Sequence, residues 1–358
     1  MAANLKICSV IFLAVVVLNE QETNGALSAR TWRKIYNANR NGPYLGLVIP
    51  NLFEMNPLLQ SPSFTSSNLT LDFDGRRFRF GTIGEKKVIL AMTGLGVINA
   101  GITTQLLLSL FKVEGVVHCG IAGNANPSLN IGDVTIPQYW SHTGLWSWQR
   151  YGQGPKDELP LESDGDYPKK IAYLKFANYT VNAAHVASYD NLLNNIWFEA
   201  EEVYPIDETP EERQHTFWVA VDPHYFNISK KLEVLKLEGC TSSTTCLSET
   251  PKVTTVKRGT SASIFLDNAA YRSFIYNKFK VRWTWKARLW HSYVFSKRCL
   301  SLLLGLSRTW PVGAWPSPMK PTPSPRSPQI IQLRLLWNLS SYYQLVSLVT
   351  KLISTHRY

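Results

Sequence analysis

Acidic residues are missing from the end of this chain: residues 282–358 contain no Asp and no Glu. The same stretch, called the tail below, holds eleven Lys or Arg. The whole chain of 358 residues has 37 basic and 26 acidic side chains, so residues 1–281 carry 26 of each and the formal charge of +11 arises in the tail. A basic module with a selected fold would normally include a few acids. The absence therefore indicates an out-of-frame translation.

The codons of the tail support this interpretation. Trp283–Lys286 is encoded TGG ACN TGG AAR, which read from its third base gives Asp, then Met, Leu or Val, then Glu. Residues 308–316 read in the same way allow Asp-Leu-Ala followed by glycines. We expect a frame break between Val281 and Trp283. We expect the tail to be a poorly ordered basic segment with at most short isolated helices.

Long hydrophobic runs are also missing. The longest near the start, Ile7–Leu18, has 12 residues, follows Lys6 and precedes the small pair Gly25 and Ala26. A helix that spans a bilayer needs ~20 apolar residues. The pattern predicts a signal peptide over residues 1–26, entry into the secretory pathway, and an extracellular or vacuolar location with no membrane attachment after cleavage.

Cysteine is scarce, with five in the chain, and there is neither a CxxC pair nor a histidine at metal-ligand spacing. We therefore expect no metal and no cofactor. Cys119 lies in an apolar run and is expected to be a buried free thiol. Cys240 and Cys246 flank a short polar loop, and an oxidising compartment favours a disulfide between them. Three Asn-x-Ser/Thr sequons predict glycosylation, at Asn68, Asn178 and Asn227.

Apolar runs and turn residues predict the fold. The runs Tyr44–Pro50, Lys87–Met92 and Val113–Cys119 indicate buried strands, and the helical stretch Val97–Phe111 separates the last two as in a βαβ unit. We also expect a hairpin at Asp74-Gly75, strands at 134–137 and 254–265, a helix at 268–280, and loops with one or two helices at 146–215. This order predicts an α/β fold, a three-layer sandwich with a central mixed β-sheet over residues 40–281 and an aberrant C-terminal end.

Glycine-rich turns follow two of the predicted strands. Thr93-Gly94-Leu95-Gly96 joins a strand to a helix, and Gly120–Gly123 follows the next strand. Glycines let a backbone approach a ligand closely, and a helix start offers N–H groups to an anion. Open α/β sheets bind ligands at the carboxyl ends of their strands. Each turn by itself is also compatible with a simple tight turn that binds nothing. The two turns together are therefore stronger evidence for a ligand site than either one alone.

Taken together, Thr93–Ala100 and Gly120–Val134 resemble the nucleoside phosphorylase and nucleosidase superfamily, in particular its plant branch of bark and vegetative storage proteins. The resemblance covers Tyr44–Val281. The shifted reading of the tail would supply two signatures that this chain lacks: a Met-Glu strand that holds ribose, and an Asp that protonates the leaving purine.

The resemblance implies roles for particular residues. Glu54 stands where nucleosidases carry the glutamate that activates water, Gly46 matches a glycine beside the phosphate or water site, and Thr93 matches a residue that contacts phosphate or ribose. Phe265, in the segment Ser261–Leu266, would stack on the base. A surface acid and a core phenylalanine remain the alternatives for Glu54 and Phe265. The implied pocket comprises Gly46, Glu54, Thr93, Gly94, Gly96, Ala122, Gly123, Phe265 and Leu266.

Four functions remain open on the sequence. The favoured one is a storage-type protein with the nucleosidase fold, derived from N-glycosidic cleavage of purine nucleosides and inactive in this chain. The others are an active nucleosidase or phosphorylase, a non-catalytic nucleoside-binding protein, and a nucleic-acid-binding protein built on the tail. The frame argument disfavours a nucleic-acid partner. The implied partners are a purine nucleoside with phosphate or water, and a homo-oligomer is left open.

Overall fold

The computed structural model describes residues 27–148, 171–175, 195–203, 214–242, 245–264, 266, 268–280, 283–286 and 300–308. Two compact units are distinguished, Met1–Gly42 and Pro43–Tyr358. The first contributes one described helix, α2 (Ala29–Asn41), which Ser28 caps by accepting a hydrogen bond from the Thr31 backbone N–H. Everything below concerns the second unit.

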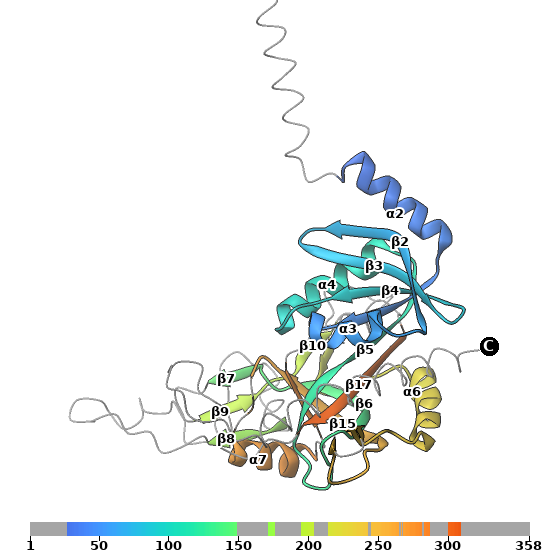
Figure 1. Cartoon of the computed structure of the whole chain (residues 1–358). Helices are drawn as coiled ribbons and strands as arrows, with labels where there is room; N and C mark the ends of the chain where they lie inside the picture. The colour runs from blue at the N-terminus through green and yellow to red at the C-terminus, as the bar shows by residue number, and fades with distance from the viewer. Residues whose placement is uncertain are drawn as a thin grey trace, which may run out of the picture. The chain divides into compact units, whose positions relative to one another are not determined.

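A mixed sheet forms the centre of the second unit (Figure 1). Its strand order in the described residues is β12-β6-β15-β16-β5-β1-β4-β3-β2, with β17 paired to both β5 and β6. The strands are β1 (Tyr44–Ile49), β2 (Phe64–Phe73), β3 (Arg76–Ile83), β4 (Lys86–Met92), β5 (Val113–Asn124), β6 (Val134–His142), β12 (Val219–Ala220), β15 (Val253–Ala262), β16 (Trp283–Lys286) and β17 (Leu300–Arg308).

The βαβ prediction is confirmed, because β4 and β5 both pair in parallel with β1 and α4 (Val97–Leu110) connects them. Strands β1, β4 and β5 are nearly continuous apolar runs, as expected where both faces of a parallel sheet are covered. The hairpin of β2 and β3 turns at Asp74 and Gly75, whose φ angles of 48° and 69° suit a tight two-residue turn.

Helices cover both faces of the sheet, which makes three layers. A Cβ placed on Gly46 of β1 would meet the Leu107 side chain of α4 at 2.8 Å. A Cβ placed on Gly115 of β5 would meet Tyr225 of α6 (Pro223–Lys230) at 2.3 Å. Gly46 is the register partner of Val116, so Gly115 projects from the opposite face to Gly46. Helices α4 and α6 therefore lie on opposite sides, as the predicted sandwich requires.

The remaining described elements surround this core. They are α3 (Leu52–Leu59), η2 (Lys231–Val234), α7 (Ala269–Phe279), β7 (Trp146–Trp148), β8 (Tyr173–Lys175), β9 (Asn195–Phe198), β10 (Glu201–Val203), β11 (Gln214–Thr216), β13 (Cys240–Ser242) and β14 (Thr245–Cys246). The short strands β7 to β11 fall in the stretch for which we predicted loops with helices. They pair with one another in small sheets, β7-β9-β8 and β10-β11. The sequence has no long apolar run here that would have predicted strands.

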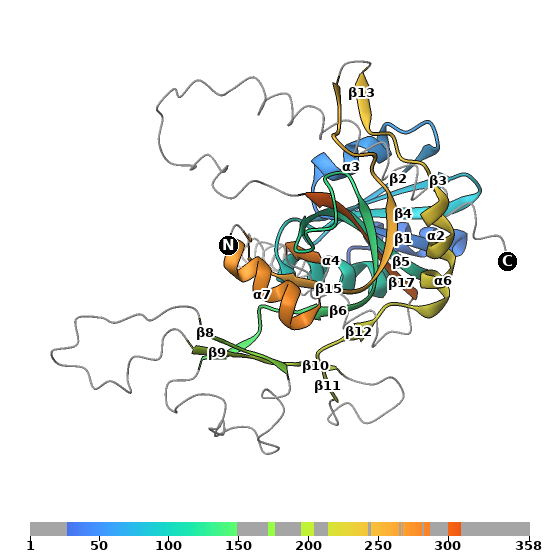
Figure 2. The ribbon, with the colours of Figure 1, turned by 90° about the horizontal axis from the view of Figure 1, so that it is seen from below.

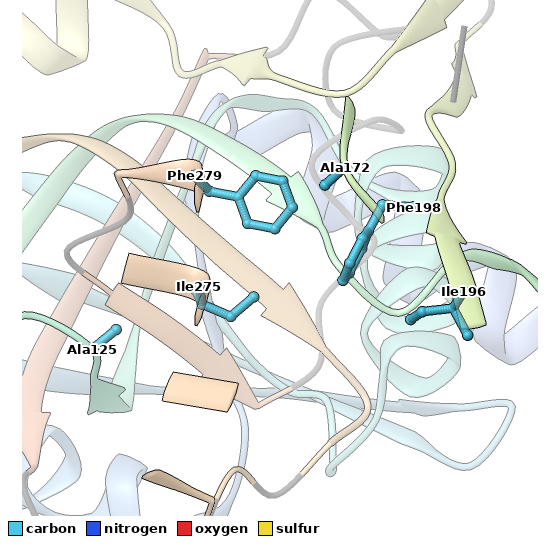
Figure 3. Packing of buried hydrophobic residues seen from close by; sticks show 6 residues of the cluster. All are labelled: Ala125, Ala172, Ile196, Phe198, Ile275 and Phe279. Atoms are coloured by element: carbon cyan, nitrogen blue, oxygen red, sulfur yellow. The ribbon is translucent and has the colours of Figure 1, made fainter. Parts of the chain in front are cut away.

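An apolar cluster joins α7 to one of these small sheets (Figure 3). Phe279 of α7 packs edge-on against Phe198 of β9, with ring centroids 5.3 Å apart. Ile275 lies in the same cluster, and so does Ala125, which directly follows β5. The cluster therefore places α7 beside the carboxyl end of β5.

The described part of the tail differs from our expectation of isolated helices. β17 pairs in parallel with nine residues of β5, from Gly115 to Gly123, and β16 pairs with β15 and β5. The physical reason lies in the sequence of β17, LSLLLGLSR, which is an apolar run of the kind that buried strands have. The other residues of the tail lie outside the described residues, so the expected disorder and the frame break stay predictions.

Candidate functional site

The carboxyl ends of β1 and β4 are tied together by two backbone hydrogen bonds. The Thr93 N–H donates to Ile49 O at 2.9 Å, and the Gly94 N–H donates to Pro50 O at 2.8 Å. Thr93 is 1% exposed, and its hydroxyl donates to Gly94 O. These bonds fix the glycine turn after β4 against the chain that leaves β1.

Glu54 enters the same edge of the sheet from α3. Asn51 caps this helix by accepting from the Glu54 N–H, which orients the first turn towards the sheet. The Glu54 side chain is 5% exposed, and its Oε1 accepts a hydrogen bond from the Ile121 N–H of β5 at 2.9 Å. Burial of a carboxylate costs free energy unless the group is hydrogen-bonded. The hydrogen bond from Ile121 therefore stabilises the buried position of the Glu54 side chain. Glu54 is not an ordinary surface acid.

The structure thus places Glu54, Thr93 and Gly94 at the carboxyl edge of the sheet, where Ala122 and Gly123 follow Ile121 on β5. Strands β4, β1 and β5 are neighbours, and all three run in the same direction. Their carboxyl ends therefore converge, as such sheets do at ligand sites.

The turn from Gly94 to Gly96 has the geometry that requires glycine. Gly94 has φ 80° and Gly96 has φ 101°, both in the region that side chains disfavour. Helix α4 begins after Gly96 without a side-chain cap. Asn99, in the first turn of the helix, donates to Leu95 O and accepts a 2.7 Å hydrogen bond from Arg76 Nη2. A helix start with a guanidinium nearby suits a negatively charged group of a ligand.

Gly46 does not join this group. It lies in the middle of β1, where the 2.8 Å approach of Leu107 to its missing Cβ explains why a glycine is present. The structure assigns Gly46 to the packing of α4 on the sheet.

The far side of the site is the end of β15. Residues Thr260–Ala262 pair with β16, and Trp283 and Thr284 of β16 pair with Asn124 and Gly123 of β5. One strand therefore separates the ends of β5 and β15. Leu266 is half-buried beyond β15. Phe265 lies outside the described residues, so its base-stacking role stays a prediction.

Sequence reasoning missed His142, the last residue of β6. It is the register partner of Ser261, and the Thr143 N–H donates to Ser261 O at 2.8 Å. Burial lowers the pKa of His142 to about 4. Tyr271 of α7 is half-buried, and desolvation raises its pKa to about 12 although its side chain hydrogen-bonds Thr143. The only sequence signal for this pair is that a His and a Ser each stand near the end of a strand.

The predicted modification sites fall on the periphery. Cys240 and Cys246 form a disulfide that links β13 and β14, the pairing favoured from the sequence. Cys119 is buried and forms no disulfide with another described residue. Asn68 on β2 and Asn227 on α6 are exposed, and Asn178 lies outside the described residues.

Within the described ranges, no three His, Cys, Asp or Glu side chains are grouped in a way that could hold a metal ion. In that same part of the chain, none of the helices has the length and apolar character needed to cross a bilayer.

Comparison with known proteins finds similarity to phosphorylases, bark storage proteins and nucleosidases. Residues 44–192 match the model of the Phosphorylase superfamily. Bark storage protein A of Populus deltoides is 29% identical over 226 residues, which cover 63% of this chain and 64% of the poplar protein. The chain thus matches a little under two thirds of the length of that relative. A 5′-methylthioadenosine/S-adenosylhomocysteine nucleosidase of Staphylococcus aureus is 27% identical over 34% of this chain and 54% of its own.

Solved structures share the fold. The Helicobacter pylori 5′-methylthioadenosine/S-adenosylhomocysteine nucleosidase aligns with a TM-score of 0.52 and 13% identity, over 87% of this chain and 98% of the other. The same enzyme from Neisseria meningitidis, in complex with methylthio-immucillin-A, aligns with a TM-score of 0.51 and 13% identity, over 87% and 99%. At this identity the likeness concerns the fold alone.

Proposed function

We propose that this chain, which belongs to the phosphorylase superfamily over residues 44–192, is a storage-type relative of nucleoside phosphorylases and nucleosidases. In this proposal it binds purine nucleosides and has little or no cleavage activity of its own. The observation that supports a nucleoside site is the buried Glu54 carboxylate, held by the Ile121 N–H. The absence of Asp and Glu from the tail supports the lack of cleavage.

The reaction class explains why this arrangement supports binding more than turnover. Cleavage of an N-glycosidic bond needs a nucleophile at C1′, which is water or phosphate, a grip on the ribose, and a proton for the leaving purine. Glu54 is suited to accept a proton from water, and the start of α4 is suited to a phosphate. The tail contains no carboxylic acid that could protonate the purine. General acid catalysis is worth ~10²–10⁴-fold, so its loss alone would reduce turnover to a trace.

A secretory and vacuolar or extracellular location is part of the proposal. It is supported by the disulfide between Cys240 and Cys246, which suits an oxidising compartment, and by exposed sequons at Asn68 and Asn227. Expression in plant cells followed by enzymatic removal of N-glycans should lower the apparent mass. A protein whose mass does not change would argue against passage through the secretory pathway.

The central experiment separates binding from cleavage. The purified chain is titrated with adenosine in a calorimeter, and the same mixture is assayed for free adenine by chromatography, with and without phosphate. We expect binding without release. Release at ~1–10³ s⁻¹, the usual range of enzymes, would establish the alternative of an active nucleosidase or phosphorylase. That alternative is favoured by the placement of Glu54.

A further inference from the structure

Strands β6 and β15 run side by side, and each has a polar residue at its carboxyl end (Figure 2). His142 and Ser261 are register partners in this parallel ladder, so their side chains project from the same face of the sheet. The imidazole Nδ1 and the Ser261 hydroxyl oxygen are both buried, and Ser261 is only 4% exposed. Neither atom has a hydrogen-bond partner among the residues that the structure describes.

Such a pair is unusual in a folded core. About nine in ten buried polar groups are hydrogen-bonded, and each one left without a partner costs ~1–3 kcal/mol. A site whose ligand supplies the missing partners is one physical reason for the exception. Two such groups side by side, from strands far apart in the sequence, strengthen this reason.

The surroundings keep the imidazole neutral and leave room for it. Burial lowers its pKa to about 4, so near neutral pH one ring nitrogen donates and the other accepts. A Cβ on Gly144 would lie 2.9 Å from His142 Nε2, so the glycine makes space for the ring. The Ser261 hydroxyl can also donate or accept.

The pair lies close to the candidate site. Ser261 pairs with Trp285 of β16, and the preceding residue of that strand, Thr284, pairs with Gly123 at the end of β5. With strands ~4.8 Å apart, Ser261 is roughly 10 Å from the end of β5, across one strand. Ser261 also begins the segment that the sequence assigns to the base.

We propose that His142 and Ser261 form a polar subsite that hydrogen-bonds the edge of a purine base. The proposal rests on the proposed function, and it adds the residues that contact the base. A purine edge presents adjacent groups: adenine offers the N7 acceptor beside the N6 amino donor, and guanine offers two acceptors, N7 and O6. A neutral imidazole and a hydroxyl can match either arrangement. The subsite therefore accepts both 6-amino and 6-oxo purines.

The test is calorimetric titration of the full chain with adenosine, for the parent protein, His142→Phe, Ser261→Ala and the double variant. Phe keeps an aromatic ring and removes the nitrogens. Each single variant should lose affinity about 3–10-fold, as expected for one hydrogen bond. The melting temperature of each free variant should stay the same or rise, because an unpartnered polar group is removed. His224→Phe is the matched control: His224 is exposed on α6, and its replacement should leave the affinity unchanged.

A second readout does not depend on the stability of a variant. In the parent protein, addition of adenosine should shift the imidazole NMR resonances of His142 and leave those of His224 in place. Unchanged affinity in the double variant, or unshifted His142 resonances with adenosine bound, would overturn the subsite while the proposed function stands. A folded parent protein that binds no adenosine would overturn both.

Discussion

Two regions of the same sheet are built in different ways. The ends of β1, β4 and β5 are held by particular side chains, such as the Glu54 carboxylate on the Ile121 N–H. The tail strand β17 enters between β5 and β6 through backbone pairing along nine residues. Any apolar run of adequate length satisfies the second requirement, whereas the first needs a hydrogen-bond acceptor placed at one particular N–H. Occupying a strand position is therefore far less demanding than restoring the chemistry at that position.

The largest expected effect comes from shifting the reading frame after Val281, where we predict a frame break. If the prediction is right, the restored chain carries an acid for the leaving purine, and its release of free purine should exceed that of the present chain by ~10²–10⁴-fold. Chromatographic assay of adenine from adenosine measures it. Glu54→Gln in the restored chain is the control and should remove most of the gain. Equal rates for both frames would mean that the tail carries its own catalytic group, and the contrast between the two regions would fail.

A second effect concerns His142, whose pKa of about 4 in the folded protein lies below the ordinary 6.5. The unfolded chain binds a proton below pH ~6.5 that the folded protein refuses until pH ~4. The contribution of His142 to the free energy of unfolding is therefore fully present above pH ~6.5. It is lost between pH ~6.5 and ~4, which lowers the free energy of unfolding by up to about 3 kcal/mol. Urea unfolding across this range measures the loss.

The variant His142→Phe separates the effect of His142 from that of the carboxylates, which titrate in an overlapping pH range. Because only the parent loses stability through His142, the free energy of unfolding of His142→Phe relative to that of the parent should rise as the pH falls from ~6.5 to ~4. Parallel curves would show that the pKa of His142 is the same in the folded and unfolded states. The end of β6 would then be solvated, unlike the buried ends of β1 and β4.

A third effect tests the tail directly. Gly305 of β17 pairs with Gly120 of β5 and with Thr135 of β6, so its backbone has a neighbour on both sides. Gly305→Pro removes the N–H and should lower the free energy of unfolding by ~1–3 kcal/mol, the cost of a buried group left without its partner. Thr322→Pro, in the proline-rich stretch, is the control and should have no effect. Equal stability of both variants would mean that β17 does not hold the sheet.

The smallest effect concerns Gly46. Gly46→Ala would bring a methyl group within 2.8 Å of Leu107 Cδ2, and such overpacking costs ~1–3 kcal/mol, towards the low end because Leu107 is a flexible side chain. Adenosine affinity should not change. Leu107→Ala should cost less stability in the Gly46→Ala chain than in the parent, because the same truncation also relieves the clash. A loss of adenosine affinity without a loss of stability would indicate that Gly46 lines the binding site.

Much of the fold could be predicted, because its signals are local. Apolar runs marked β1, β4 and β5, and the glycine turn marked the start of α4. Glu54 depended on the resemblance, since nothing in the residues around it distinguishes a buried carboxylate from a surface one. The subsite of His142 and Ser261 could not be predicted. It depends on the register between β6 and β15, where the bonded residues Thr143 and Ser261 are 118 positions apart.

The strand β17 has a consequence for the fate of the protein in the cell. By lying between β5 and β6 it covers backbone groups of both strands that would otherwise attract other chains. Quality control recognises exposed hydrophobic surface and open edges rather than missing catalysis. A chain whose sheet is filled in this way can accumulate in the cell whether or not it retains catalysis, which is the property that the proposed storage function requires.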